Sequence, residues 1–356
     1  MSEKSELLTL PYPAHTGNKT QAKSPKSPTG SVDSSALLLG LFAAAAYSVA
    51  NMALRGLAKA DGGPGWDMWV AGTKAFPTFF VAIVLIAWRR WNGQTSFAEW
   101  SFVWPIAVAA LFNQLGGNFA FQMSLRAIGL AISVPICFSS IICSGAVVGR
   151  IVLGDQVTVR TAISMGLMVA SIVFLSTAAQ SRSAPVPDNA AVSEDTSVQV
   201  DRVAEQTLKT NPPTGVTAGV ALSMLSGLCY GVTGVFIRKA VRSHMPVAAT
   251  LFLFSAAGFL ILCPGSLLLL PLGDIARTTP SEWMTIATAG IFNAIGFFAI
   301  THAMRTLTIS RANVINASQN ALCAIGAVLV FSESLAPLAL LGIGLTISGL
   351  LVLDRR

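Results

Sequence analysis

The sequence contains few charged residues for its length. Of its 356 residues, only 11% are Asp, Glu, Lys or Arg, whereas 53% are apolar. A soluble domain carries about 25% charged residues, so there are too few charges here to cover a water-exposed surface. This scarcity argues against an ordinary cytosolic enzyme and favours a membrane protein.

Motifs that mark catalysis, metal binding or nucleotide binding are also missing. The five cysteines lie in apolar stretches without Cys-x-x-Cys spacing, which predicts buried thiols and neither a disulfide nor a zinc site. The sequence has no His-Glu-x-x-His, no glycine loop followed by Lys and Ser or Thr, and no Gly-x-Ser-x-Gly. The 23 Lys and Arg residues are scattered and form no patch with aromatic residues. We therefore expect no enzyme, no cofactor, no metal, no ATP-driven pump and no nucleic-acid partner.

Long apolar runs are abundant. Runs of about 20 residues without strand-like alternation indicate transmembrane helices. We predict ten, at residues 36–56, 67–88, 102–125, 130–153, 158–178, 216–237, 247–270, 283–304, 309–331 and 335–353. Residues 1–33 are expected to form a disordered cytoplasmic tail, and residues 179–215 a polar linker between two sets of five helices.

The two sets of helices resemble each other in sequence. Tyr47 recurs as Tyr230, 183 residues later, and Asp155 is matched by Glu333 at a spacing of 178. An odd number of spans in each unit makes the second copy enter the membrane from the opposite side. The predicted fold is therefore an all-α polytopic membrane protein with ten transmembrane helices in two inverted five-helix repeats.

The distribution of basic residues predicts the orientation. With the N-terminus inside, the cytoplasmic segments collect 15 of the 23 Lys and Arg residues. Both termini should then be cytoplasmic and the linker should lie outside. We expect a multi-pass protein of the plasma membrane or an inner membrane.

Each repeat ends with two apolar helices joined by a short acidic loop, Leu153-Gly154-Asp155 in the first repeat and Phe331-Ser332-Glu333 in the second. In this pattern the chain resembles EamA-type units of the drug/metabolite transporter superfamily, over residues 36–178 and 216–353. The resemblance implies a ten-helix carrier in which the first four helices of each unit surround a central cavity. A proline frequent in that family is replaced by Ile142 and Asn320, so no helix kink is implied there.

Lys74 is the clearest candidate for a substrate-binding residue. It lies about two turns inside the second predicted helix and has no charged counterpart in the second repeat. An ionisable side chain near the bilayer core usually faces a pathway or a partner. We expect Lys74 to attract a carboxylate or another anionic group of the substrate. The alternative is a lysine whose long stem reaches the membrane interface.

Polar side chains at helical spacing predict the rest of the site. Residues three or four apart share one face of a helix, which in lipid must turn to other helices or to water. Such a face either lines a cavity or joins helices by hydrogen bonds. The predicted substrate-binding residues besides Lys74 are Tyr47, Asn51, Gln114, Asn118, Tyr230, Asn293, Asn316 and Asn320, with Gln122 and Asn313 on the same stripes.

Three further titratable residues are candidates for coupling transport to protons or for gating the pathway. His302, the only histidine within a predicted span, is a candidate for proton coupling because histidine changes charge near neutral pH. Its alternative role is a hydrogen bond near a helix end. We expect Asp155 and Glu333 to accept hydrogen bonds from the amides that open the next helix, with gating as the alternative.

Small-residue spacings occur at Gly145-x-x-x-Gly149 and Gly227-x-x-x-Gly231. Glycines four apart let helix backbones approach closely. We therefore predict that these two segments are packing surfaces.

The favoured function is a secondary transporter that moves a small polar metabolite by alternating access. The preferred substrate is an amino acid or a related compound, and the expected direction of transport is export. Its partners would be the solute and the lipid bilayer, and a homodimer is left open. One alternative is a sugar-phosphate or nucleotide-sugar exchanger, whose cavity should hold more cations, with Arg126, Arg305 and Arg311 as candidates. Another is a non-transporting sensor or assembly protein on the same scaffold.

Overall fold

The computed structural model describes residues 34–59, 61–97, 100–154, 158–182, 213–243, 245–307 and 309–354. Of the residues in these ranges, 86% are helical and none is in a strand. The predicted tail (1–33) lies outside the described residues, as do Asp155 and residues 183–212 of the predicted linker. Helix α7 continues to Arg182 and α9 begins at Pro213, so both helices extend into the predicted linker.

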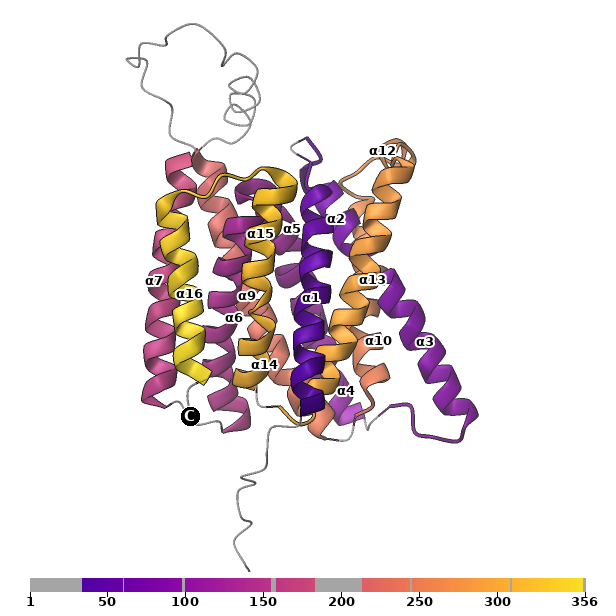
Figure 1. Ribbon diagram of the computed structural model, residues 1–356. Helices are drawn as coiled ribbons and strands as arrows, with labels where there is room; N and C mark the ends of the chain where they lie inside the picture. Colours follow the sequence, from indigo (N-terminus) through magenta and orange to yellow (C-terminus); the bar gives the residue numbers. More distant parts are fainter. Residues whose placement is uncertain are drawn as a thin grey trace, which may run out of the picture.

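The first half of the chain forms helices that run alternately up and down a bundle (Figure 1). They are α1 (Ser34–Gly56), α2 (Gly63–Thr73), α3 (Phe76–Trp91), α4 (Trp100–Phe112), the π-helix η1 (Asn113–Phe119), α5 (Ala120–Ile128), α6 (Leu130–Leu153) and α7 (Val159–Arg182). Two of the predicted helices are interrupted. The second changes from α2 to α3 at Lys74 and Ala75, and the third contains η1.

The second half follows the same up-and-down course. It comprises α9 (Pro213–Arg242), α10 (Val247–Ala257), the π-helix η2 (Gly258–Leu262), α11 (Cys263–Ser266), α12 (Leu272–Ala276), α13 (Pro280–Ala303), α14 (Ile309–Asn316), α15 (Gln319–Phe331) and α16 (Pro337–Asp354). Here too, two predicted helices are interrupted. One contains η2, and the other is broken at Ala317 and Ser318, between α14 and α15.

The protein is an integral, multi-pass membrane protein. Among the described residues, six helical segments are long and apolar enough to cross a bilayer. They are Ser34–Gly56, Gly63–Trp91, Leu130–Leu153, Gly215–Arg242, Val247–Ser266 and Pro280–Ala303. Shorter apolar helices lie at Ala162–Ala178, Gln319–Phe331 and Pro337–Gly349.

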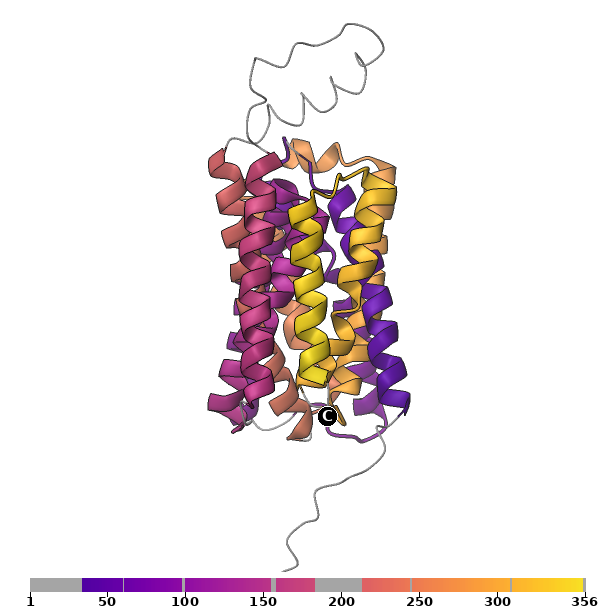
Figure 2. The same cartoon turned by 60° about the vertical axis from the view of Figure 1, so that its left-hand side comes forward.

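The bundle has two distinct ends (Figures 1 and 2). Helix α1 begins and α16 ends at the same end, which we call the terminal end. Helix α7 ends and α9 begins at the opposite end, which we call the linker end. Each half of the chain therefore starts at one end of the bundle and finishes at the other.

Close packing between the halves involves the predicted glycine surfaces. A Cβ atom at Gly227 or Gly231 of α9 would collide with α6, near the carbonyl oxygens of Cys137 and Ile141 respectively. A Cβ atom at Gly231 would also lie 3.0 Å from the backbone nitrogen of Gly145. The predicted close packing is confirmed for Gly145, Gly227 and Gly231.

Two apolar clusters fill the bundle above and below its middle. The cluster towards the linker end includes Leu54, Leu125 and Val134, all buried. The cluster towards the terminal end includes Ala43, Val241 and other buried residues of α9, α10 and α13. Polar side chains between these clusters lie inside the bundle, with apolar packing on both sides.

Candidate functional site

A cavity of about 190 Å³ lies between the two apolar clusters. Residues from both halves of the chain line it. On α9 and α13 the lining begins near the middle of the helix, at Tyr230 and Asn293, and continues towards the terminal end as far as Ile237 and Met304. The lining residues are Tyr47, Asn51, Lys74, Ala75, Thr78, Asn113, Gln114, Asn118, Phe121, Cys137, Phe138, Ile141, Tyr230, Thr233, Gly234, Ile237, Ser255, Asn293, Phe297, Ile300, Met304, Asn313, Asn316 and Gln319.

Most of the residues predicted to bind substrate surround this cavity. Eight of the nine line it, namely Tyr47, Asn51, Lys74, Gln114, Asn118, Tyr230, Asn293 and Asn316. Asn320 does not line the cavity. Its side chain is fully buried and has no hydrogen-bond partner in the described part of the protein. His302 lies on the exposed surface of α13, also outside the lining.

Lys74 is located where the second span is interrupted. Its backbone nitrogen still bonds to the carbonyl oxygen of Val70, but α2 ends at Thr73 and α3 begins at Phe76, with Pro77 in its first turn. The side chain is only 4% exposed. No carboxylate of a described residue lies within ion-pair distance of its ammonium. The cavity therefore contains an ammonium without a protein counter-ion in the described part of the chain.

A chain of hydrogen bonds joins the two halves across the cavity. The Tyr230 hydroxyl donates to Asn118 Oδ1 at 2.9 Å, and Asn118 Nδ2 donates to Gln114 Oε1 at 2.7 Å. Gln114 Nε2 in turn donates to the carbonyl oxygen of Phe254 at 2.5 Å. The π-helix η1 carries both amides, and Phe254 lies one turn before η2. These bonds fix which edge of each amide faces the cavity.

A second hydrogen-bonded group connects α1 with the break between α14 and α15. Asn51 Nδ2 donates to Gln319 Oε1 at 3.0 Å, and Gln319 Nε2 donates to the carbonyl oxygen of Asn316 at 3.0 Å. Gln319 was missed by the sequence analysis, which assumed an unbroken helix and chose Asn320. The break at Ala317 and Ser318 changes the register, so that Gln319 faces the cavity.

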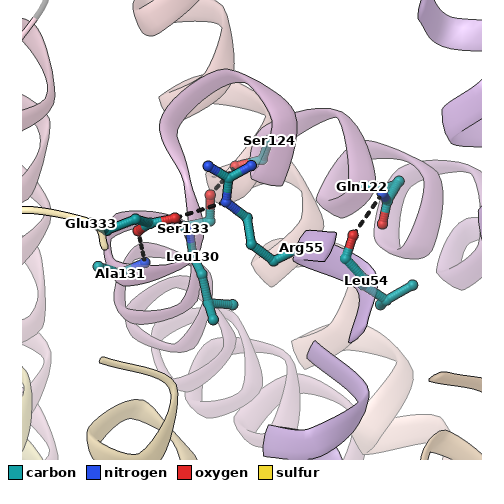
Figure 3. Close-up of polar contacts among 8 residues, drawn as sticks. All are labelled: Leu54, Arg55, Gln122, Ser124, Leu130, Ala131, Ser133 and Glu333. Carbon is teal, nitrogen blue, oxygen red and sulfur yellow. Dashed lines mark hydrogen bonds and ion pairs between the residues drawn. The ribbon is translucent and has the colours of Figure 1, made fainter. Parts of the chain in front are cut away.

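Gln122 also departs from its predicted stripe. The side chain is buried, and its Nε2 donates to the carbonyl oxygen of Leu54 at 3.1 Å (Figure 3). It does not line the cavity. The wider turn of the π-helix before it takes Gln122 off the face shared by Gln114 and Asn118.

Above the cavity, at the linker end, Glu333 contacts two elements of the first half (Figure 3). Its carboxylate accepts hydrogen bonds from the backbone nitrogens of Leu130 and Ala131, both at 3.1 Å, and from Arg55 Nε at 2.7 Å. The sequence analysis expected Glu333 to bind amides of the following helix. It binds the first amides of α6 instead, because the loop after α15 lies against the start of that helix.

Two more ion pairs lie at the linker end. Arg126 pairs with the fully buried Asp67 at 2.9 Å within the first half. Lys59 pairs with Glu282 of the second half, and its ammonium also lies 4.0 Å from the centroid of the Trp66 ring. Together with the contact between Arg55 and Glu333, these pairs connect the helix ends that surround this end of the bundle.

Comparison with known proteins identifies the second half of the chain. Residues 217–353 match the sequence model of the EamA-like transporter family. Over these residues the chain is similar to the EamA-like transporter family. The match covers the five apolar segments after the linker and confirms the resemblance seen in the sequence for the second repeat. Because the EamA-like family consists of membrane transporters, the match points to a membrane transporter.

Solved structures support the same fold outside the EamA-like segment. One of them, described only as a crystal structure of a protein, superimposes with a TM-score of 0.57 over 90% of this chain and 96% of that chain. Its sequence identity is 15%, so the likeness concerns the fold alone. In all, 24 solved chains match. No curated protein sequence matches the chain.

Proposed function

We propose that the protein is a secondary carrier that moves a small polar metabolite across the membrane by alternating access. The observation that carries this proposal is the cavity within the bundle. Both halves of the chain line it, and among its amide side chains it contains one ammonium without a counter-ion in the described part of the chain. A solute held there would be within reach of both ends of the bundle, as alternating access requires.

In this proposal, residues 36–178 and 216–353 are inverted five-helix units. The course of the chain supports it, because the first half runs from the terminal end to the linker end and the second half runs back (Figures 1 and 2). Segments too short for a span on their own, such as α4 with η1 and α5, complete the five crossings.

The contacts between helices support a twofold relation of the units. Helix α1, the first of its unit, packs against α13, the third of the other. In the same way, α9 packs against α4, η1 and α5. The second helices meet through α3 and α10, and the fifth helices through α7 and α16. Such reciprocal pairing is expected when two copies of one unit face each other.

The interrupted helices also support a transport site at the cavity. In many carriers, substrate and ions bind where transmembrane helices are discontinuous, because backbone polar groups are free there. Here Lys74 lies at one break, Gln114 and Asn118 lie in η1, and Asn316 and Gln319 flank a third. All five side chains line the cavity.

The orientation with both termini in the cytoplasm is supported by the basic residues at the terminal end. These are Arg89, Arg90, Arg150, Arg160, Lys239, Arg242, Arg305 and Arg311. An excess of Lys and Arg marks the cytoplasmic side of a membrane protein. The protein would then lie in a plasma or inner membrane and export its substrate from the cytoplasm.

For the solute we propose an amino acid or a related compound that carries a carboxylate. The lining contains one cation, Lys74, whereas a phosphate-bearing solute calls for more. Arg126 is ion-paired with Asp67, and Arg305 is exposed. Neither lines the cavity, which favours a carboxylate over a sugar phosphate.

Uptake by proteoliposomes tests the proposed function. Purified protein would be reconstituted, loaded with a pooled metabolite mixture and assayed for exchange by mass spectrometry. We expect time-dependent movement of at least one small carboxylate, and none through liposomes without protein.

Thiol labelling tests the pathway separately. Cysteines at positions 118 and 316 would be introduced into a variant without native cysteines, because Cys137 also lines the cavity. We expect membrane-impermeant reagents to reach both positions. If both positions resist labelling from either side, the cavity is not a pathway, and a sensor or assembly role is favoured.

A further inference from the structure

The charge of the cavity lining is one-sided. Among the described residues that line the cavity, Lys74 is the only charged one and none is Asp or Glu. The nearest carboxylate in sequence, Asp67, lies two turns earlier in α2, where it is paired with Arg126. A buried charge is strongly disfavoured unless a partner compensates it. The bound solute is therefore expected to supply the missing negative charge.

A second polar group accompanies the ammonium. Thr78 follows Lys74 by four residues, on the other side of the break between α2 and α3. Thr78 is 2% exposed, and its hydroxyl has no hydrogen-bond partner among the described residues. Both side chains line the cavity. An ammonium and a free hydroxyl on adjacent turns can together hold the two oxygens of one carboxylate.

No charged partner is available for a positive group of the solute. An amino acid would bring an ammonium into a cavity whose described lining has no carboxylate. The amide oxygens of Gln114, Asn118 and Gln319 already accept hydrogen bonds from protein donors. Asn316 Oδ1 has no partner among the described residues and could accept from the ammonium, but it carries no charge to balance it. The ammonium of the solute would also lie in the same small space as Lys74. A zwitterion is therefore a poorer match than an anion of the same shape.

The remaining lining is suited to an apolar body. Five aromatic side chains, Tyr47, Phe121, Phe138, Tyr230 and Phe297, border the cavity. The volume of about 190 Å³ is below the range of about 300–1,000 Å³ found for drug-sized ligands, so the solute must be small.

We propose that Lys74 and Thr78 bind the carboxylate of a small organic monoanion, and that the cavity prefers such an acid to the amino acid of the same skeleton. This inference rests on the proposed function, because it assigns the substrate class of the same cavity. It narrows an amino acid or related compound to a monocarboxylate without an amino group.

Matched solutes test the preference in the full-length protein. Three trios would be used, with the skeletons of alanine, leucine and phenylalanine. Each trio consists of the 2-hydroxy acid, the amino acid and the corresponding amine without a carboxylate. Binding would be measured by calorimetry in detergent, and transport by exchange in proteoliposomes. In at least one trio, we expect the hydroxy acid to bind roughly tenfold or more tightly than the amino acid, and the amine not to bind.

Variants test whether Lys74 and Thr78 cause the preference for the hydroxy acid. Lys74→Met should lower the affinity for the preferred hydroxy acid by roughly tenfold or more, and Thr78→Val by about fivefold. Thr78→Ser should restore most of the loss because it keeps the hydroxyl. Matched controls are Lys239→Met and Thr177→Val, which make the same changes at exposed positions of α9 and α7 and should bind as the wild type does.

A charge added to the lining provides a further variant. Asn293 lines the cavity, and no hydrogen bond of its side chain involves a described residue. Asn293→Asp should lower the ratio of hydroxy-acid to amino-acid affinity, because the new carboxylate opposes the anion and accepts from an ammonium.

The outcomes separate this inference from the proposed function. If the amino acids bind as tightly as the hydroxy acids, or if Lys74→Met binds them unchanged, the inference is wrong. The same holds if no trio binds. In each of these cases, exchange of any compound from the pooled mixture would still support the carrier function. Absence of all exchange by folded protein would overturn the carrier function itself.

Discussion

Arg55 Nε lies 2.7 Å from Glu333 Oε1, and this contact connects the end of α1 with the loop that follows α15. The same carboxylate accepts from the first two amides of α6. A helix N-terminus carries a partial positive charge, so the carboxylate has three favourable donors. Gly129, directly before α6, has a φ of 76°, and a Cβ there would crowd the carboxylate. Glycine at this position permits both the turn and the close approach.

Replacing Glu333 with Gln should destabilise the protein. The side-chain shape is kept, but the charge is lost and the NH2 group faces donors. Removing one partner of a largely buried ion pair costs about 3 kcal/mol, so the thermal midpoint in detergent should fall by several degrees. The matched control is Asp274→Asn, which removes an exposed ion pair with Arg277 and should change the midpoint little. Equal effects of the two variants would mean that Glu333 does not stabilise α6.

Linking positions 55 and 333 should stop transport. If the two halves rock against each other, the linker end must open, and the contact between Arg55 and Glu333 has to separate. In a variant without native cysteines, the pair Arg55→Cys and Glu333→Cys would be joined by a short bis-methanethiosulfonate reagent, which forms a reducible disulfide with each cysteine. We expect proteoliposome exchange to fall to background and to return when the link is reduced.

The control for this link stays within one half. Arg126 and Asp67 form an ion pair inside the first unit, which moves as a body in the proposed cycle. A link between cysteines at these two positions should leave exchange largely intact. Exchange that survives the link between the halves would contradict opening at the linker end.

The register change between α14 and α15 predicts opposite outcomes at neighbouring positions. Gln319→Leu removes a group that lines the cavity and accepts from Asn51, so exchange should fall about tenfold. Asn320→Leu removes a buried amide without a partner in the described structure, so exchange should persist and the thermal midpoint should hold or rise. Exchange rates and unfolding curves of the two variants check this. The reverse order of effects would indicate an unbroken helix.

The close contact of α9 with α6 predicts a strong effect of one methyl group. Gly227→Ala would place its Cβ against the backbone of α6, and overpacking of this kind costs about 1–3 kcal/mol. Gly166→Ala in α7 is the matched control, since nothing lies within 4 Å of the added Cβ. We expect a lower thermal midpoint for the first variant and an unchanged or higher one for the second. Equal thermal midpoints of the two variants would show that α6 and α9 can move apart without loss of stability.

The helical fold and most of the cavity lining followed from sequence because both depend on regular periodicity. Long apolar runs predicted the helices, and polar residues at spacings of three and four marked the faces of Tyr47 and Asn51 and of Gln114 and Asn118. The repeat pointed to Tyr230. Tyr47, Asn51 and Tyr230 lie in regular α-helix, whereas Gln114 and Asn118 lie in the π-helix η1. The structure places all five around the cavity.

The remaining features of the site depend on departures from regular α-helical geometry, which the sequence pattern did not predict. A break at Ala317 and Ser318 selected Gln319 over Asn320, and η1 turned Gln122 away from the cavity. No proline lies within either interruption to mark it in the sequence. The partner of Glu333 was missed for another reason. Its target amides at the start of α6 lie about 200 residues earlier and come close only through the packing of the two halves.

A fixed ammonium in the cavity makes the proposed cycle electrically asymmetric. With a monoanion bound to protonated Lys74 the site is neutral, whereas the empty site carries one positive charge as long as Lys74 stays protonated. Moving one charge through 100 mV is worth about 2.3 kcal/mol, so voltage acts on the return of the empty carrier and leaves the loaded step nearly unaffected. In a membrane with a negative interior, the field would draw the empty site towards the cytoplasm, where the next molecule for export is bound.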